Sequence, residues 1–369
     1  MWRVLLAVAG LGLFATRAVS APGTPEACAV AERFANPALL ATMRRGVNLP
    51  GWDNDDAARR PTVQQLEALR DRGFTHVRLL LDGARLEGPR RAAYLDQMYE
   101  QAILLFSLDY TVSLDLHAGD ILNRQASPEA YLTELWQQIA KRVRFLDPAK
   151  LAVELLNEPQ ADQATWWPLA GRLVAEIRTI LPSHSIVVGP AGPQRHEELA
   201  GLQPFPDPNV IYAVHYYDPF VFTHQGADWG GPDDPLRFLG GLPFPAQASD
   251  QAITARLAEL EATGQIRAAD AVKLSLDKPW DDAMISSAFD VMAGWSGRWQ
   301  RPVIVNEFGV LSWRAPRQSR LDWLADVRRN AEERCIGWTH WDFQDGFGLM
   351  DPDTGMPDEG VMDALIPKK

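Results

Sequence analysis

The sequence has few basic residues, few cysteines and no internal repeat. Its 36 Lys and Arg stand against 48 Asp and Glu, so the formal net charge is −12, and no stretch is rich in Lys and Arg. A chain this acidic repels phosphate backbones, and we therefore expect no nucleic acid partner.

Only two cysteines are present, Cys28 and Cys335, and they lack the clustered spacing that a zinc site needs. In an oxidising compartment they could pair and tie the N-terminal segment to the rest of the chain. Two free thiols are the alternative, and the sequence leaves both open.

The first twenty residues differ in character from the rest. Met1-Trp2-Arg3 is a short basic start, residues 4–15 are almost all apolar, and Ala18-Val19-Ser20 offers a small-x-small cleavage site. This pattern predicts a secretory signal peptide over residues 1–20, with an uncleaved membrane anchor as the alternative. We expect a secreted or periplasmic protein that is not bound to a membrane after cleavage.

Beyond residue 40, short β-branched runs alternate with longer amphipathic segments. The candidate strands are Arg45–Leu49, Thr75–Leu80, Thr111–Leu116, Leu151–Leu156, Ser185–Val188, Val210–His215, Val303–Asn306 and Ile336–Trp341. Apolar residues spaced at three and four predict the helices Thr62–Arg72, Arg91–Leu108, Pro128–Phe145, Ala164–Ile180, Asp282–Gly297 and Ser319–Arg334.

Strands that are apolar on both faces and separated by helices predict a parallel sheet covered by helices. A doubly wound open sheet would show the same alternation. However, eight β/α units with no Gly-rich phosphate loop after the first strand favour a closed (β/α)8 TIM barrel. We expect this barrel over residues 41–369, after an N-terminal segment formed by residues 21–40.

One connection is too long for a single crossover, because 87 residues separate His215 from Val303. Its first part, Asp218–Pro245, is rich in Gly, Pro and aromatic residues, and Thr254–Lys273 predicts one or two surface helices. We expect a long excursion over the barrel mouth after strand 6, and not a second domain. It should bring aromatic residues to the mouth, namely Phe220, Phe222, His224 and Trp229.

Polar or aromatic residues mark nearly every candidate strand. They are Arg78 within the second, His117 after the third, Asn157 and Glu158 after the fourth, His215 and Tyr217 at the sixth, Asn306 and Glu307 at the seventh, and Trp341 at the eighth. Singly, each has a structural explanation, such as an arginine paired with a buried carboxylate or a satisfied core histidine. Reacting groups of a (β/α)8 barrel lie at the C-terminal strand ends, so their convergence there favours a functional site.

Glu158 and Glu307 form a candidate catalytic pair. Two carboxylates in different surroundings can act as acid and nucleophile on a glycosidic bond, about 5–5.5 Å apart in retaining enzymes and about 6.5–9.5 Å in inverting ones. Indole faces stack on sugar rings, and the 13 Trp residues fit such a ligand, although several must belong to the core.

Seven motifs occur in order over residues 40–350. They are Arg44–Leu49, Val77-Arg78, Leu114–His117, Asn157–Pro159, His215–Tyr217, Asn306–Gly309 and Trp341. Together they resemble glycoside hydrolase family 5, the cellulase-like retaining enzymes with a (β/α)8 fold. The resemblance implies that Glu158 is the acid/base and Glu307 the nucleophile, so Glu158 needs a raised pKa while it donates a proton. No metal or organic cofactor is expected, because two carboxylates and a water molecule suffice for this chemistry.

The same resemblance implies six substrate-binding residues. Arg78 and Tyr217 would flank the nucleophile, Asn157 would bind the sugar 2-hydroxyl, His117 and His215 would complete the polar floor, and Trp341 would lie under the sugar at the point of cleavage.

The interpretation we favour is a monomeric endo-β-1,4-glucanase acting on a polysaccharide or oligosaccharide. A β-mannanase or a β-1,3-glucanase would share the catalytic set, and the enzyme could instead trim an exopolysaccharide made by the same cell. A metal-dependent hydrolase is disfavoured because His117 and His215 stand alone, and not as a His-x-His pair. A non-catalytic polysaccharide-binding barrel is disfavoured because both carboxylates are present.

Overall fold

The computed structural model describes residues 26–368. Eight parallel strands close into a barrel in sequence order, and β1 pairs with β8. The strands are β1 (Arg45–Asn48), β2 (His76–Asp82), β3 (Thr111–His117), β4 (Leu151–Glu154), β5 (Ser185–Val188), β6 (Val210–Tyr216), β7 (Val303–Phe308) and β8 (Gly337–His340). The closed barrel is therefore confirmed. The signal peptide predicted for residues 1–20 lies outside the described residues.

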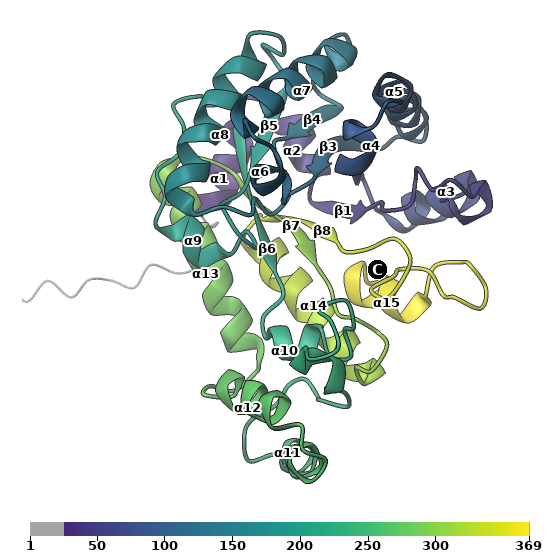
Figure 1. The fold of residues 1–369 in the computed structure, drawn as a ribbon, viewed down its shortest axis with the longest axis vertical. Coiled ribbons are helices and arrows are strands. Elements are labelled where there is room, and N and C mark those ends of the chain that lie inside the picture. Colours follow the sequence, from purple (N-terminus) through teal and green to yellow (C-terminus); the bar gives the residue numbers. More distant parts are fainter. Residues whose placement is uncertain (1–25, 369) are drawn as a thin grey trace, which may run out of the picture.

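Helices surround the barrel and connect its strands (Figure 1). The long ones are α3 (Val63–Arg72), α5 (Arg91–Ser107), α7 (Pro128–Val143), α8 (Gln163–Arg178), α13 (Asp282–Trp299) and α14 (Arg317–Glu333). The shorter ones are α1 (Glu26–Arg33), α2 (Pro37–Thr42), α4 (Gly83–Glu87), α6 (Ile121–Arg124), α9 (His196–Ala200), α10 (Phe220–Thr223), α11 (Gln251–Ala262), α12 (Ile266–Ser275) and α15 (Glu359–Leu365), with 3-10 turns η1 (Ala57–Arg59) and η2 (Pro235–Phe238). Of the helices in residues 26–368, none is long and apolar enough to cross a membrane.

Helix α3 shows how local sequence sets the element ends. The Thr62 side chain accepts a hydrogen bond from the Gln65 backbone N–H, and the Gln65 side chain bonds back to the Thr62 N–H, which is a capping box. Gly73 then ends the helix in the left-handed conformation, with φ 116°. Strand β2 begins three residues later and carries Arg78 into the barrel interior.

Strand β4 is shorter than the sequence predicts. Its ladder ends at Glu154 and not at Leu156, because β5 pairs only with Ala152–Glu154. The chain then follows β3, and the Asn157 N–H donates to the Leu116 carbonyl at 2.9 Å. Asn157 and Glu158 therefore lie on a short loop beyond the C-terminal end of β4.

Helices α1 and α2 close the N-terminal end of the barrel and lie behind the strands in Figure 1. The apolar cluster at this end joins Phe34, Leu39, Leu40 and Met43 to Ala152, Val187, Ile211, Ala213 and Ile304 of the strands. Apolar burial thus fills the bottom of the barrel. The buried polar side chains described below lie at the opposite end.

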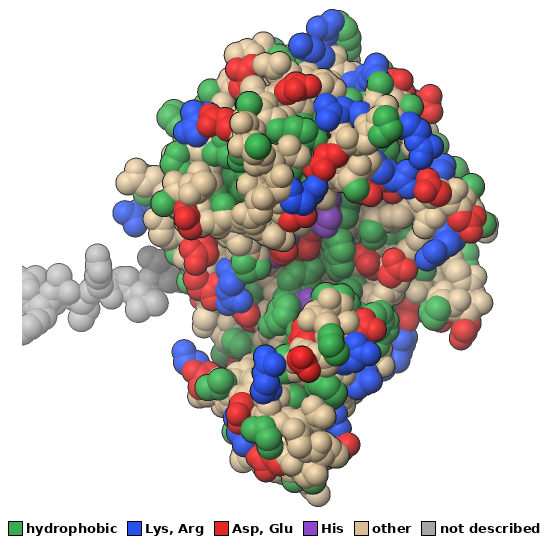
Figure 2. Space-filling model, viewed as in Figure 1, with side chains coloured by type: hydrophobic (Ala, Val, Ile, Leu, Met, Phe, Trp, Pro, Cys, Tyr) green, Lys and Arg blue, Asp and Glu red, His purple; other side chains and the backbone are tan. Residues whose placement is uncertain are grey.

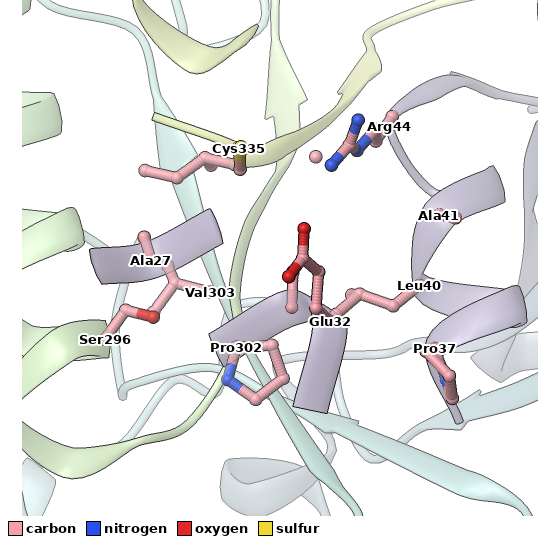
Figure 3. A pocket seen from close by; sticks show the side chains of 13 residues that line it. Ala27, Glu32, Pro37, Leu40, Ala41, Arg44, Ser296, Pro302, Val303 and Cys335 are labelled. Atoms are coloured by element: carbon pink, nitrogen blue, oxygen red, sulfur yellow. The ribbon is translucent and has the colours of Figure 1, made fainter. Parts of the chain in front are cut away.

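A disulfide joins Cys28 of α1 to Cys335, which precedes β8. The bond spans 307 residues of sequence and ties the segment that closes the barrel bottom to the last strand. The free-thiol alternative is wrong. A cavity of about 250 Å³ lies beside the disulfide, and Figure 3 shows the side chains of Glu32 and Arg44 directed into it.

The excursion between β6 and β7 extends away from the barrel at the lower edge of Figure 1, where α11 and α12 form the expected pair of surface helices. Phe222, Phe244 and Trp280 of this segment are buried and belong to the main hydrophobic core. The prediction that places Phe222 at the mouth is therefore wrong, since its ring packs against Phe244 with centroids 5.6 Å apart.

Replacing both cysteines, Cys28→Ser with Cys335→Ser, should lower the free energy of unfolding by about 2–5 kcal/mol, because the bond restricts the unfolded chain over a long loop. Urea denaturation of the wild type and the double variant measures this. Activity in the absence of denaturant should stay unchanged, since the bond lies at the opposite end of the barrel from the C-terminal strand ends. Equal denaturation midpoints would show that the disulfide contributes no stability.

Candidate active site

Arg78 lies at the centre of a polar layer near the C-terminal end of the barrel. Its side chain is fully buried. Nε and Nη2 donate to the two Glu154 oxygens at 2.8 and 2.9 Å, and Nη2 also donates to Asn157 Oδ1 at 2.9 Å. Nη1 donates to Asn48 Oδ1 at 2.9 Å and to Glu307 Oε1 at 2.6 Å. All five N–H groups of the guanidinium therefore have an acceptor.

Glu307 projects from β7 and is 5% exposed. Besides Arg78, its carboxylate accepts a hydrogen bond from Tyr217 Oη at 3.1 Å, and His215 Nδ1 lies 3.4 Å from Oε2. The two donors approach different oxygens of the carboxylate, Arg78 at Oε1 and Tyr217 at Oε2, and so fix its orientation.

Asn306 also reaches the barrel interior, although it is adjacent to Glu307 in sequence. Its Nδ2 donates to Glu154 Oε1 at 2.8 Å. Successive residues of a regular strand point to opposite faces. The pairing of β7 with β8 is irregular between Val305 and Phe308, and an irregularity of this kind can turn both side chains inward.

Glu158 has an unusual backbone conformation, with φ 41°, which is in the left-handed region that non-glycine residues rarely adopt. Its N–H donates to the buried side chain of Gln194, Oε1, at 2.9 Å. Gly119 packs directly against this loop, and a Cβ there would lie 2.3 Å from the Glu158 carbonyl oxygen. The absence of a side chain at Gly119 thus lets the β3 and β4 loops approach closely.

The two candidate carboxylates meet at His215. Its Nδ1 hydrogen-bonds to Glu158 Oε1 at 2.9 Å. One carboxylate oxygen of Glu158, one of Glu307 and a ring nitrogen of His215 all lie within 4.8 Å of one another. The sequence therefore correctly places Glu158 and Glu307 at one site, although they are far apart along the chain.

His117 and Trp341 line the same cavity as the two carboxylates. Their rings are stacked, with centroids 5.6 Å apart and planes inclined by 14°. His117 Nδ1 hydrogen-bonds to buried Asp115 Oδ2 at 2.9 Å. Burial disfavours charge on His117, but this hydrogen bond and the negative charges of Asp115 and Glu307 together outweigh burial and raise the pKa of the imidazole.

In the unliganded site the pKa of Glu158 is lowered, and the raised pKa expected while it donates a proton stays a prediction. Burial alone would raise it, but the hydrogen bond from His215 and the nearby positive charges outweigh that effect and lower the pKa of this carboxyl group. Glu154 behaves in the opposite way. Its burial, together with the charge of Asp115, raises the pKa of Glu154 despite the contact with Arg78.

Two sets of side chains in the described residues have the spacing of metal ligands. The first consists of Glu158, His215 and Glu307. Arg78 Nη1 lies 2.6 Å from Glu307 Oε1, and the permanent positive charge of this guanidinium opposes the binding of a cation. The second consists of His196, Glu197 and Asp218. All four of its carboxylate oxygens accept hydrogen bonds from Arg195.

These residues open into a cavity of about 650 Å³ at the C-terminal end of the barrel, lined by His117, Asn157, Glu158, Pro193, Arg195, His215, Tyr217, Phe220, His224, Trp229, Glu307, Trp341 and Phe347. Figure 2 shows it as a hollow between two lobes, with acidic and histidine side chains in its depth. Arg78 alone among the predicted site residues does not line it and lies beneath the floor.

The sequence interpretation misses three buried residues of the polar layer, namely Asn48, Asp115 and Glu154. Each contacts Arg78, at distances of 2.9, 3.1 and 2.8 Å respectively. A signal was present, because Asp115 and Glu154 are charged residues inside apolar strands, as Arg78 is. An inward-facing acid in a buried strand needs a partner, and a buried arginine supplies it.

A closed (β/α)8 barrel whose C-terminal end presents two close carboxylates beside an indole has the arrangement of a retaining glycoside hydrolase. Residues 40–346 match the family described as cellulase (glycosyl hydrolase family 5). The chain belongs to this family and is a cellulase-like glycoside hydrolase.

Two relatives are bacterial endoglucanases. Endoglucanase 3 of Fibrobacter succinogenes is 27% identical over 352 residues, covering 88% of this chain and 52% of that protein. The chain thus spans about half the length of this relative. Endoglucanase C of Acetivibrio thermocellus is 23% identical over 328 residues, covering 83% of this chain and 92% of its own length.

Solved structures share the fold. A hyperthermophilic endo-β-1,4-glucanase in complex with substrate superposes with a TM-score of 0.72 at 24% identity, over 91% of this chain and all of the other. The Clostridioides difficile cellulose synthase subunit Z gives 0.70 at 23% identity, over 88% and 99% of the two chains. Thermotoga maritima Cel5A in complex with mannotriose gives 0.69 at 23% identity, over 89% and 100%.

Replacing Gly119 with Ala should displace the Glu158 loop, because the new Cβ would overlap a backbone oxygen that cannot move alone. Hydrolysis should fall by at least about tenfold, since a misplacement of about 1 Å costs rate steeply. Gly294→Ala is the matched control. Nothing lies within 4 Å of a Cβ there, on helix α13, and its activity should equal the wild type. Equal activity of Gly119→Ala would contradict this account of the loop.

Proposed function

We propose that the protein is a secreted endo-β-1,4-glucanase that hydrolyses β-linked glucan with retention of configuration. The observation that carries this proposal is the pair Glu158 and Glu307, with carboxylate oxygens within 4.8 Å of each other. This spacing fits the retaining arrangement, in which the carboxyl groups stand about 5–5.5 Å apart, better than the inverting one. The names of the relatives support a β-1,4-glucan substrate.

In this mechanism Glu307 attacks the anomeric carbon and forms a glycosyl ester, while Glu158 donates a proton to the departing sugar oxygen. Arg78 and Tyr217 hold the attacking carboxylate by one hydrogen bond to each oxygen. Ester formation removes the negative charge of Glu307. Glu158 is then free to take a proton from the incoming water, which releases the sugar and regenerates both carboxyl groups.

Glu158 must be protonated for the first step, although its pKa is lowered in the free site. Its side chain is 40% exposed. A bound sugar would cover the carboxyl group and remove its water, and this desolvation shifts the pKa upward. Substrate binding itself therefore brings Glu158 into the protonated form that the reaction needs.

The remaining predicted residues take positions around the sugar at the cleavage point. Trp341 supports its apolar face, beside the stacked ring of His117. Asn157 has its Oδ1 bound to Arg78, which leaves its Nδ2 to donate to the sugar 2-hydroxyl. The disulfide between Cys28 and Cys335 supports export, because such bonds persist in oxidising compartments.

Two variants of the proposal have specific support. The likeness to a structure with bound mannotriose supports β-mannan as the alternative substrate, and the enzyme would then be a β-mannanase. The likeness to a cellulose synthase subunit supports action on cellulose that the same cell makes. A β-1,3-glucanase shares the catalytic pair but has no comparable observation in its favour.

The proposal is tested by incubating the protein with carboxymethylcellulose, mixed-linkage β-glucan, laminarin and glucomannan and recording product sizes. We expect rapid shortening of the first two, with intermediate products, and no turnover by Glu307→Gln. Faster cleavage of glucomannan would establish a mannanase. Faster cleavage of laminarin would establish a β-1,3-glucanase. Binding without hydrolysis by the wild type would establish a non-catalytic barrel.

Glu158→Ala should slow hydrolysis by about 10²–10⁴-fold, the usual contribution of a positioned acid or base. Azide, a small nucleophile that needs no base, should partly restore turnover and yield a β-glycosyl azide. Mass spectrometry and proton NMR of the product identify the compound and its configuration. An α-linked product would contradict a retaining mechanism, and full activity without azide would remove Glu158 from the acid/base role.

The pH profile gives a second check on Glu158. Loss of the proton from Glu158 sets the alkaline limb of the kcat/KM profile, and His215 lowers the pKa of Glu158. Removing this influence with His215→Leu should move the alkaline limb to higher pH, and His215→Asn, which keeps a hydrogen-bond donor, should move it less. A limb that stays in place or moves to lower pH would contradict the assigned interaction.

A further inference from the structure

Gln194 lies in the loop between β5 and α9, behind the wall of the active-site cavity. Its neighbours in sequence, Pro193 and Arg195, both line the cavity, but Gln194 does not. It is 0% exposed. A glutamine buried in this way cannot contact the substrate, so any effect on the reaction must pass through the residues that it holds.

Gln194 fills a gap in the sheet at the height of the site. Strand β5 lies between β4 and β6, but its pairing with β6 ends at Val188. Beyond that point Gln194 takes the place of β5. Its Oε1 accepts the Glu158 N–H at 2.9 Å, and its carbonyl oxygen accepts the His215 N–H at 2.9 Å. One residue thus bridges the chain that follows β4 to strand β6.

These two hydrogen bonds end on the residues whose side chains meet in the site. His215 Nδ1 lies 2.9 Å from Glu158 Oε1. The backbone of Glu158 is left-handed, with φ 41°, and so is that of Gln194, with φ 50°. Non-glycine residues keep this conformation only where surrounding contacts hold them in it. The Gln194 amide supplies such a contact to Glu158, whose loop has already left the sheet.

The start of the β5–α9 loop leaves room for this amide. A Cβ at Gly189, the first residue after β5, would lie 1.6 Å from Gln194 Nε2. Any larger residue at this position would therefore displace the amide from Glu158. The loop is fixed to the chain after Glu158 a second time, because the Gly192 N–H donates to the Pro159 carbonyl at 2.8 Å.

We propose that Gln194 is a positioning residue for the proton transfer by Glu158. It holds the Glu158 backbone against His215, so that the carboxyl group faces the glycosidic oxygen, and it does so without touching the substrate. This inference rests on the proposed function and adds a residue that the reaction needs only because Glu158 must deliver a proton.

The test compares two substrates that differ in their need for an acid. Cellotetraose releases a sugar oxygen that must be protonated as it leaves, whereas a dinitrophenyl β-cellobioside releases a phenolate that leaves without a proton. Gln194→Met removes the acceptor and keeps an unbranched side chain of similar length. It should lower kcat/KM for cellotetraose by about tenfold or more, and leave kcat/KM for the aryl glycoside within about twofold.

Two further variants separate positioning from a structural role. Gln194→Glu keeps an acceptor oxygen at the same reach and should lose less activity on cellotetraose than Gln194→Met. Gly189→Ala displaces the amide while leaving Gln194 in the chain, and it should show the same dependence on the substrate. Gln251→Met changes an exposed glutamine of α11 and is the control, which should match the wild type on both substrates.

Equal losses of kcat/KM on the two substrates would overturn the proposal, and so would an unchanged value for cellotetraose in Gln194→Met or Gly189→Ala. Thermal denaturation shows which variants are folded, and Gly189→Ala decides the question if Gln194→Met is not. A wild type that cleaves neither substrate would instead reject the proposed function. The two failures are therefore distinct.

Discussion

The structure depends on one buried guanidinium. Arg78 would be costly to bury alone, and it is stable here because every N–H group has an acceptor and three carboxylates surround it. Two of these, Asp115 and Glu154, are as buried as the arginine and come from the adjoining strands β3 and β4. The third is Glu307. One side chain thus links strands β2, β3, β4 and β7 at the height of the site.

The layer around Arg78 carries more acidic groups than basic ones. Its surplus negative charge contributes to a raised pKa both in an acid and in a base of this layer. The pKa of Glu154 rises because of its burial and because Asp115 is close. The pKa of His117 rises because its hydrogen bond to Asp115, together with the charges of Asp115 and Glu307, outweighs burial. Substituting one residue of this layer therefore changes the pKa values of its neighbours as well, and the effects of single substitutions here will not be additive.

Much of the architecture follows from the sequence, because the strands are short apolar runs and the long helices repeat apolar residues at spacings of three and four. The barrel and the meeting of Glu158 with Glu307 could be predicted because parallel strands place their C-terminal ends together. Asn48 could not be predicted, since a strand residue does not reveal which face it occupies until the register is known. Glu154 could have been noticed as a charged residue inside an apolar strand, but its partners depend on the register. The pairing of Cys28 with Cys335 also depends on three-dimensional proximity alone.

The excursion was the least predictable part, because its aromatic residues follow no regular period. Phe222 and Trp229 are seven residues apart and look alike in the sequence, yet one is in the core and the other faces solvent.

Barrel closure has a consequence for how the chain can acquire its structure. Strand β1 has only two neighbours, β2 and β8, and the second is separated from it by almost the whole chain. A growing polypeptide that lacks residues 337–340 leaves one edge of β1 and one edge of β7 without a partner. Ribosome-bound intermediates therefore carry two open sheet edges until β8 has been synthesised, and binding by a chaperone before that point would protect them from aggregation.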